Sequence, residues 1–88
     1  MTNKKEDLKK KIIYRSNYRG TKEMDSLMGS FTKKYINKLN YSELINLSEL
    51  LDVDDDNLYK FQQGHKISII IEKNKVTQLF KNFIYKKD

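Results

Sequence analysis

An apolar stripe at helical spacing runs through the second quarter of this 88-residue chain. Its members are Met24, Leu27, Met28, Phe31, Tyr35 and Leu39. Residues three or four apart lie on one face of an α-helix, whereas a half-buried strand alternates every two residues. A stripe of this width is stable only when other elements cover it. The pattern therefore predicts a helix over about residues 21–39 that forms one wall of a common core.

Two capping patterns predict the helices on either side of this one. Asn3 is followed by Glu6, and Asn40 by Glu43, at the three-residue spacing of a capping box. The first pair opens a helix over about residues 4–14. The second pair opens a leucine-rich helix that ends near residue 51.

The last third of the chain predicts two more helices. Acids in the segment 52–56 favour the N-terminus of a short helix around Leu58, and Gly64 suits its C-terminal cap. Residues 67–71 are rich in isoleucine, but no second strand is evident to pair with them, so we expect an extended connection. Apolar residues at helical spacing then predict a final helix over about residues 70–86.

The absence of proline and cysteine supports a helical chain and excludes several kinds of site. Without proline, no helix is interrupted. Without cysteine, the chain forms no disulfide, no thiolate metal site and no cysteine nucleophile. A chain of this length makes one small domain. We therefore expect an all-α fold, a small five-helix bundle, with a single domain over residues 1–88 and a core over about residues 8–83.

Positive charge is concentrated at the N-terminal end of the chain. Residues 1–22 hold eight basic and two acidic side chains, and their balance equals the whole net charge of +6. Such a patch suits nucleic acid, an anionic membrane or an acidic protein face, and it equally suits the simple solvation of a short helix. No apolar run approaches the ~20 residues of a membrane span. The apolar edge of residues 4–14 is also too narrow for firm insertion at a membrane surface.

Tyrosines and arginines interleave directly after the lysines, as Tyr14, Arg15, Tyr18 and Arg19. This combination is typical of surfaces that bind phosphates and stack bases. It is equally typical of protein–protein hot spots, where tyrosine and arginine are enriched. The composition alone leaves both interpretations open.

The start of the predicted 21–39 helix carries more charge than a helix start requires. Gly20 suits the N-cap, and Glu23 then falls at the third helical position, near the positive end of the helix dipole. Arg15 and Arg19 lie one helical turn apart just upstream, and Asp25 points away from the apolar stripe. A purely structural helix start needs neither two arginines nor a second acid. This surplus of charged residues is a first indication of a partner-binding site.

No constellation in the sequence indicates an enzyme or a metal site. Asp52, Asp54 and Asp56 begin like a calcium loop, but Asn57 replaces the required glycine and Gln63 the required glutamate. The single histidine has no cysteine or second histidine beside it. No glycine-rich phosphate loop is present. We therefore expect no catalytic residues and no metal ligands.

The run of residues 14–31 has the pattern Y-R-S-x-x-R-G-x-x-E-x-D-x-L-x-x-x-F. This pattern resembles the succinate dehydrogenase assembly factor family, the small flavinylation factors of bacteria and mitochondria. The likeness extends downstream to the acidic segment before Leu58 and Tyr59, and it covers about residues 8–83. The chain differs from many relatives at Asn17, where they carry tryptophan, and at Tyr18, where they carry arginine or histidine.

The resemblance implies an assembly chaperone and not an enzyme. Such factors bind the flavoprotein subunit of succinate dehydrogenase or fumarate reductase and promote covalent attachment of FAD to a histidine of that client. FAD then belongs to the client, and the factor holds no cofactor firmly and is a monomer before it binds the client. The resemblance places the contact centre at Arg19, Gly20 and Glu23, with Arg15 and Asp25 beside it.

The resemblance is to the bacterial type, and the N-terminus agrees with a cytoplasmic location. It carries Glu6 and Asp7 and lacks a following apolar core, which is typical of neither a secretory signal nor an acid-poor transit peptide. We therefore expect a bacterial cytoplasmic protein that binds no nucleic acid. The alternative is a small basic helical protein that does bind nucleic acid, as the charge of +6 and the Tyr/Arg cluster allow.

Overall fold

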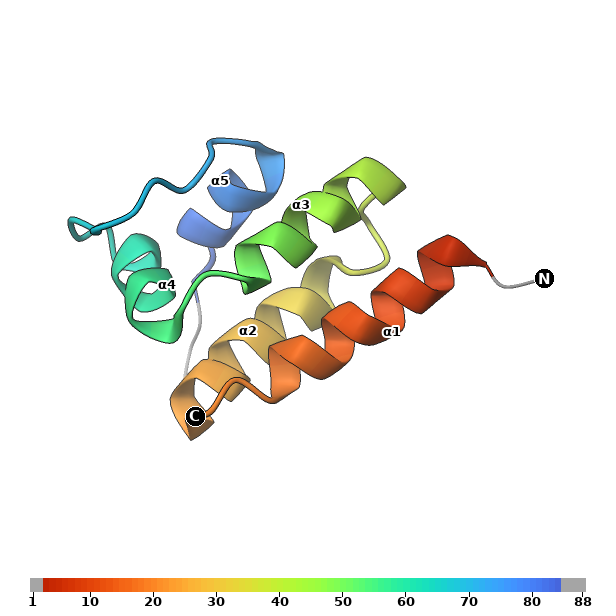
Figure 1. Cartoon of the computed structure of the whole chain (residues 1–88), viewed down its shortest axis with the longest axis horizontal. Coiled ribbons are helices and arrows are strands. Elements are labelled where there is room, and N and C mark those ends of the chain that lie inside the picture. The colour runs from red at the N-terminus through yellow and green to blue at the C-terminus, as the bar shows by residue number, and fades with distance from the viewer. Residues whose placement is uncertain (1–2, 85–88) are drawn as a thin grey trace.

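The computed structural model describes residues 3–84, and within that range it contains five α-helices and no strand. They are α1 (Lys4–Asn17), α2 (Lys22–Tyr35), α3 (Tyr41–Leu51), α4 (Asp55–Gln62) and α5 (Lys75–Lys81) (Figure 1). The predicted all-α fold with five helices is therefore confirmed.

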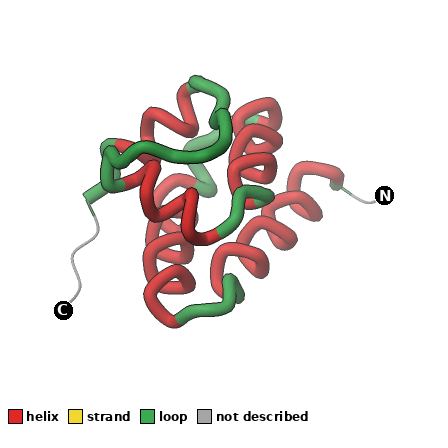
Figure 2. Tube along the Cα trace, turned by 60° about the vertical axis from the view of Figure 1, so that its left-hand side comes forward, coloured by secondary structure: helices red, strands yellow, loops and turns green. Residues whose placement is uncertain are grey.

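The helices pack in two connected groups. α1 lies against α2 and α3, while α5 lies against α3 and α4 (Figure 1). Figure 2 shows the long loop between α4 and α5 running across the outside of the helices. Residues 67–71, which we expected to be a connection, lie in this loop, and Ile70 is 98% exposed there.

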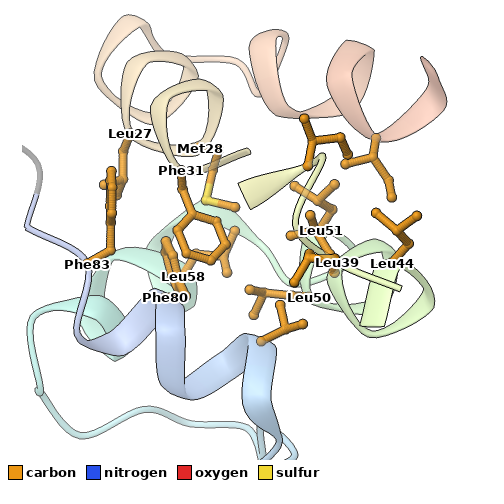
Figure 3. Packing of buried hydrophobic residues seen from close by; sticks show 14 of the residues in the cluster. Leu27, Met28, Phe31, Leu39, Leu44, Leu50, Leu51, Leu58, Phe80 and Phe83 are labelled. Atoms are coloured by element: carbon orange, nitrogen blue, oxygen red, sulfur yellow. The ribbon is translucent and has the colours of Figure 1, made fainter. Parts of the chain in front are cut away.

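Phe31 lies in the middle of a core to which all five helices contribute (Figure 3). Its ring meets Phe80 and Phe83 edge-on, with ring centroids 5.2 and 5.4 Å away. Such edge-to-face pairs add to the free energy gained from burying the rings. The predicted stripe is buried at every position except Tyr35, which is half-buried. The helical spacing of the stripe therefore identified the core face of α2 correctly.

α1 and α2 approach closely because small side chains meet between them. The Ser16 and Thr32 hydroxyl oxygens lie 2.6 Å apart in the buried interface, and Ser16 also donates to the Ile12 carbonyl oxygen. One turn earlier on α2, a Cβ on Gly29 would stand only 2.5 Å from Oδ1 of Asn17. The mid-helix glycine therefore leaves room for the Asn17 side chain. This explains why α2 contains a glycine, which ordinarily destabilises a helix by about 1 kcal/mol relative to alanine.

The N-cap of α2 is Thr21, and the prediction of Gly20 at that position is wrong. The Thr21 hydroxyl accepts a hydrogen bond from the Met24 backbone N–H at 3.2 Å. A glycine has no side-chain oxygen that could do this. Gly20 instead precedes the cap with φ = +128°, so it turns the chain between α1 and α2. Glu23 accordingly occupies the second helical position and not the third.

Three predicted boundaries also differ from the structure. α1 continues to Asn17, because Ser16 packs against Thr32 within the helix. α2 ends at Tyr35, and residues 36–38 form a turn that still buries Ile36. α5 is much shorter than the predicted helix over 70–86, whose residues 85–86 lie outside the described range. The Asn74–Thr77 capping box starts α5 only at Lys75.

The Asn40–Glu43 capping box of α3 is confirmed. Glu43 has a lowered pKa in this box, so the free energy of unfolding should depend on pH. The Asn40 backbone N–H and the Lys75 ammonium at 3.1 Å hold the pKa of Glu43 below its usual value near 4.5. Because the folded-state pKa is the lower one, this stabilisation is complete above about pH 4.5 and is lost as pH falls through the folded pKa.

We therefore expect the urea midpoint to decrease when the pH is lowered from 6 to 3. This decrease should be larger for the wild type than for the Glu43→Gln variant. Glutamine keeps the capping hydrogen bond but carries no titrating charge, so it is the matched control. Equal falls for the two proteins would show that Glu43 does not contribute to the acid sensitivity.

Candidate functional site

Arg19 faces inward and joins the α1–α2 loop to the start of α4. Its Nε donates to Asp55 Oδ1 at 2.8 Å, and its Nη2 donates to the Val53 carbonyl oxygen at 2.6 Å. Its Nη1 donates to the carbonyl oxygen of Leu51, the last residue of α3. The side chain is only 10% exposed. Arg19 thus satisfies one backbone carbonyl at the end of α3 and one just after it, and it pairs with the first-turn acid of α4.

Arg15 makes a similar but more exposed connection one turn earlier. Its Nη1 lies 3.1 Å from the Ser48 hydroxyl and 3.3 Å from the Ser48 carbonyl oxygen, and its Nη2 pairs with Asp52. The side chain is 35% exposed. Both arginines therefore have partners within the chain. The premise that a structural helix start needs no arginines is wrong, because these two connect α1 and its loop to α3 and α4.

Asp25 also turns back toward the chain and is only half-buried. Its Oδ1 accepts a hydrogen bond from the backbone N–H of Arg19, so it holds the loop that contains Gly20. Asp25 is not part of the buried stripe, as predicted, but its carboxylate contacts the preceding loop and does not simply face solvent. The short side chain of an aspartate near the start of α2 can accept a hydrogen bond from the preceding loop. Helical spacing alone does not predict this contact.

Gly20 and Glu23 are the exposed members of the predicted site. Glu23 stands at one rim of an open groove of about 510 Å³ between α2, α4 and the residues after α5. Met24, Leu27 and Phe83 supply apolar lining, while Tyr59 and Gln62 line it from α4. The structure therefore brings an acid, an exposed glycine and a partly apolar groove together at one end of α2.

The acidic run after α3 starts α4 as predicted, and it also forms ion pairs that the sequence did not reveal. Asp52 and Asp55 pair with the two arginines, and Asp56 pairs with Lys60 at 3.0 Å. Asp54 caps α4, and the Asn57 side-chain amide and backbone N–H hold its pKa below the usual range. The spacing offered one clue: Arg15 and Arg19 are four residues apart, and their partners Asp52 and Asp55 are three apart.

The described residues hold no group of three or more histidines, cysteines, aspartates or glutamates that could bind a metal ion. His65 lies exposed in the loop after α4. Within residues 3–84, no helix combines the length and apolar character that crossing a membrane requires. The site therefore consists of polar and apolar contact residues at the ends of helices.

Gly20 allows a test that separates backbone strain from partner contact. Its φ of +128° strains any L-residue, although a Cβ would meet Asp55 Oδ2 only at 3.8 Å. We expect Gly20→Ala to lower the free energy of unfolding by about 1–3 kcal/mol, the usual cost of such a conformation. Gly20→Arg carries the same strain and adds a long cation at the predicted contact centre.

The measurements are thermal melts by circular dichroism and a pull-down with the flavoprotein. Gly20→Arg should bind far less flavoprotein than Gly20→Ala at similar helicity. Equal loss of binding in the two variants would make Gly20 a structural residue only.

Comparison with known proteins shows the family to which the chain belongs. A model of the family described as "Flavinator of succinate dehydrogenase" matches residues 10–84. A relative from Dictyostelium discoideum, named "Succinate dehydrogenase assembly factor 2, mitochondrial", is 33% identical over 81 residues, which cover 92% of this chain and 52% of the relative. A relative of the same name from Scheffersomyces stipitis is 41% identical over 49 residues, covering 56% of this chain and 33% of the relative. No solved structure gave a significant match.

The names and lengths of these relatives add two facts. Each is named as a mitochondrial protein, so the expectation of a bacterial cytoplasmic protein is contradicted. The chain spans about half the length of the Dictyostelium relative and less of the other. The family match nevertheless covers most of the chain and includes Arg19, Gly20 and Glu23. The chain therefore belongs to the flavinator family of succinate dehydrogenase, a family of assembly factors.

Proposed function

We propose that the protein binds the flavoprotein subunit of succinate dehydrogenase or fumarate reductase and promotes covalent attachment of FAD to a histidine of that subunit. The observation that carries the proposal is the family match over residues 10–84. The name of the relatives, succinate dehydrogenase assembly factor 2, supports the same class of client.

In this proposal the factor positions its client and supplies no catalytic group. FAD and the acceptor histidine both belong to the flavoprotein. Binding holds the client's flavin and capping domains in a productive geometry, which lowers the entropic part of the barrier to bond formation. The described part of the bundle holds no cluster of side chains that could bind a metal ion, and this suits such a role.

The contact surface of the proposal is centred on Gly20 and Glu23. Both are exposed, and Glu23 borders the groove between α2 and α4. Arg19 and Asp25 hold the loop that presents them. Arg15 keeps about a third of its side chain exposed, so it can also touch the client directly.

The nucleic-acid alternative loses part of its basis in this structure. Of the basic residues in the first 22, Arg15, Arg19 and Lys9 pair with carboxylates within the described chain. A protein that binds by neutralising phosphates needs such cations available at its surface. A salt titration with generic DNA and RNA tests the alternative, which predicts binding that falls steeply as salt rises.

The decisive experiment uses cells that lack their own flavinylation factor. Expression of this protein should restore covalent FAD on the flavoprotein subunit, seen as in-gel flavin fluorescence, and the two proteins should co-purify. An untransformed strain and a strain given excess riboflavin are the controls. Full factor expression with no covalent flavin and no co-purified flavoprotein would contradict the proposal.

A further inference from the structure

The Tyr/Arg cluster of the sequence is divided by the structure. Its arginines turn inward, while Tyr14 and Tyr18 stand outward with 65% and 69% of their surfaces exposed. Their ring centroids lie 4.6 Å apart at an interplanar angle of 33°. Together with Lys10, Ile13 and Asn17 the two rings line a shallow hollow of about 530 Å³ on α1. We call these five residues the tyrosine face.

The fold does not need the two tyrosines of this face for its own packing, since each exposes about two thirds of its surface. α1 is anchored through Ile12 and Ser16, both fully buried against the rest of the bundle. Ile13 is 44% exposed, so three large apolar or aromatic side chains lie together on one open helix surface. Tyrosines in such clusters are enriched among the residues that dominate protein–protein binding.

The charge around the tyrosine face is positive. From Leu8 to Lys22 the chain holds six basic residues and no acid. Lys10, Lys11 and Lys22 are exposed, and none of them forms an ion pair within residues 3–84. Lys10 borders both the tyrosine hollow and a second hollow on the other side of Tyr14. The surface is therefore complementary to acidic groups that surround an apolar side chain.

We propose that the tyrosine face is a second contact surface for the flavoprotein, and that it takes an acidic segment of that client with an apolar side chain in the hollow. The proposal rests on the proposed function. The client's carboxylates meet Lys10 and Lys11, while its apolar side chain packs against Tyr14 and Tyr18. Tyr14 lies in the last turn of α1 and Tyr18 directly follows that helix, just before Gly20, so one client can reach the tyrosine face and Glu23 together.

A single-stranded nucleic acid fits this surface less well. A strand-binding groove carries cations along the backbone and separate aromatic platforms for successive bases. Here the two rings contact each other, and only a few lysines are available beside them. Cationic and aromatic groups confined to one patch suit a compact acidic epitope.

The experiment measures binding of the purified flavoprotein to purified full-length factor by calorimetry, at low and moderate salt. The test variants are the double change Tyr14→Ala with Tyr18→Ala, and Lys10→Glu. The matched controls are Tyr41→Ala, another tyrosine that is 45% exposed, and Lys73→Glu, an exposed lysine in the α4–α5 loop. Circular dichroism confirms that each variant is folded.

We expect the double tyrosine variant to weaken binding about 30-fold, the size of an interface hot spot. Lys10→Glu should weaken it several-fold and reduce its salt dependence, while the two controls stay within about two-fold of wild type. If Glu23→Ala weakens binding but the tyrosine and Lys10 variants match their controls, the inference is overturned and the proposed function stands. If wild-type factor does not bind the flavoprotein at all, both fall. If the factor binds a poly-U oligonucleotide tightly and Lys10→Glu abolishes that binding, the ligand of the tyrosine face is nucleic acid and not an acidic segment of the client.

Discussion

Glu23→Ala is expected to abolish covalent FAD attachment to the client while lowering the melting temperature of the factor by only a few degrees. Glu23 is exposed in the first turn of α2. An exposed acid in such a position contributes about 0.3–1 kcal/mol through the helix dipole, and an exposed ion pair adds about 0–1 kcal/mol. Truncating one partner of a desolvated charge contact across an interface costs roughly 2–5 kcal/mol or more in binding. The loss of binding should therefore far exceed the loss of stability.

The measurement is the fraction of flavoprotein that carries covalent FAD, by in-gel fluorescence, in cells that express each variant. Glu6→Ala is the matched control, because Glu6 is another exposed acid in the first turn of a helix, α1, away from the site. Cells that express the Glu6→Ala variant should attach covalent FAD to the client as fully as cells that express the wild type. Normal flavinylation with Glu23→Ala would remove Glu23 from the contact centre.

Arg19→Ala should cause a large loss of stability in the isolated factor. The change leaves the half-buried Asp55 carboxylate without its cation and two carbonyl oxygens, of Leu51 and Val53, without their donor. Leaving one member of a buried ion pair costs about 3–5 kcal/mol, and Asp55 retains 27% exposure, so we expect about 2–4 kcal/mol. For a domain of this size that corresponds to a fall of about 10–25 °C in melting temperature.

Arg15→Ala is the matched control for this change. It removes the same side chain from the same helix end, but its partner Asp52 is 72% exposed, and exposed pairs contribute about 0–1 kcal/mol. A double-mutant cycle of Arg19→Ala with Asp55→Ala should show a coupling free energy in the unfolding of the factor alone. If the effects of Arg19→Ala and Asp55→Ala on stability are additive, the expected coupling is absent. A melting temperature of Arg19→Ala close to that of Arg15→Ala would likewise contradict the structural role of Arg19.

The helices and the core face of α2 follow from local rules, and the sequence predicted them well. Met24, Leu27 and Phe31 lie three or four residues apart, so any helix over them must present one apolar face. Asn40 with Glu43 marks a helix start because both halves of the capping box lie within one turn. The predicted boundaries were less accurate where a side chain that contacts another helix decided them. Ser16 continues α1 because it meets Thr32 on α2, sixteen residues away.

The sequence by itself therefore determined the all-α fold, the apolar stripe of α2, and the residues that connect this chain to its family. Which members of the predicted site are exposed was decided by the tertiary structure. Arg15 and Arg19 meet Asp52 and Asp55 across 37 and 36 residues of chain, and no local period reports contacts at that separation. Ion pairs depend on where packed helix ends meet. Only the packing of α1 against α3 turned the arginines inward and left Gly20, Glu23 and the tyrosine face at the surface.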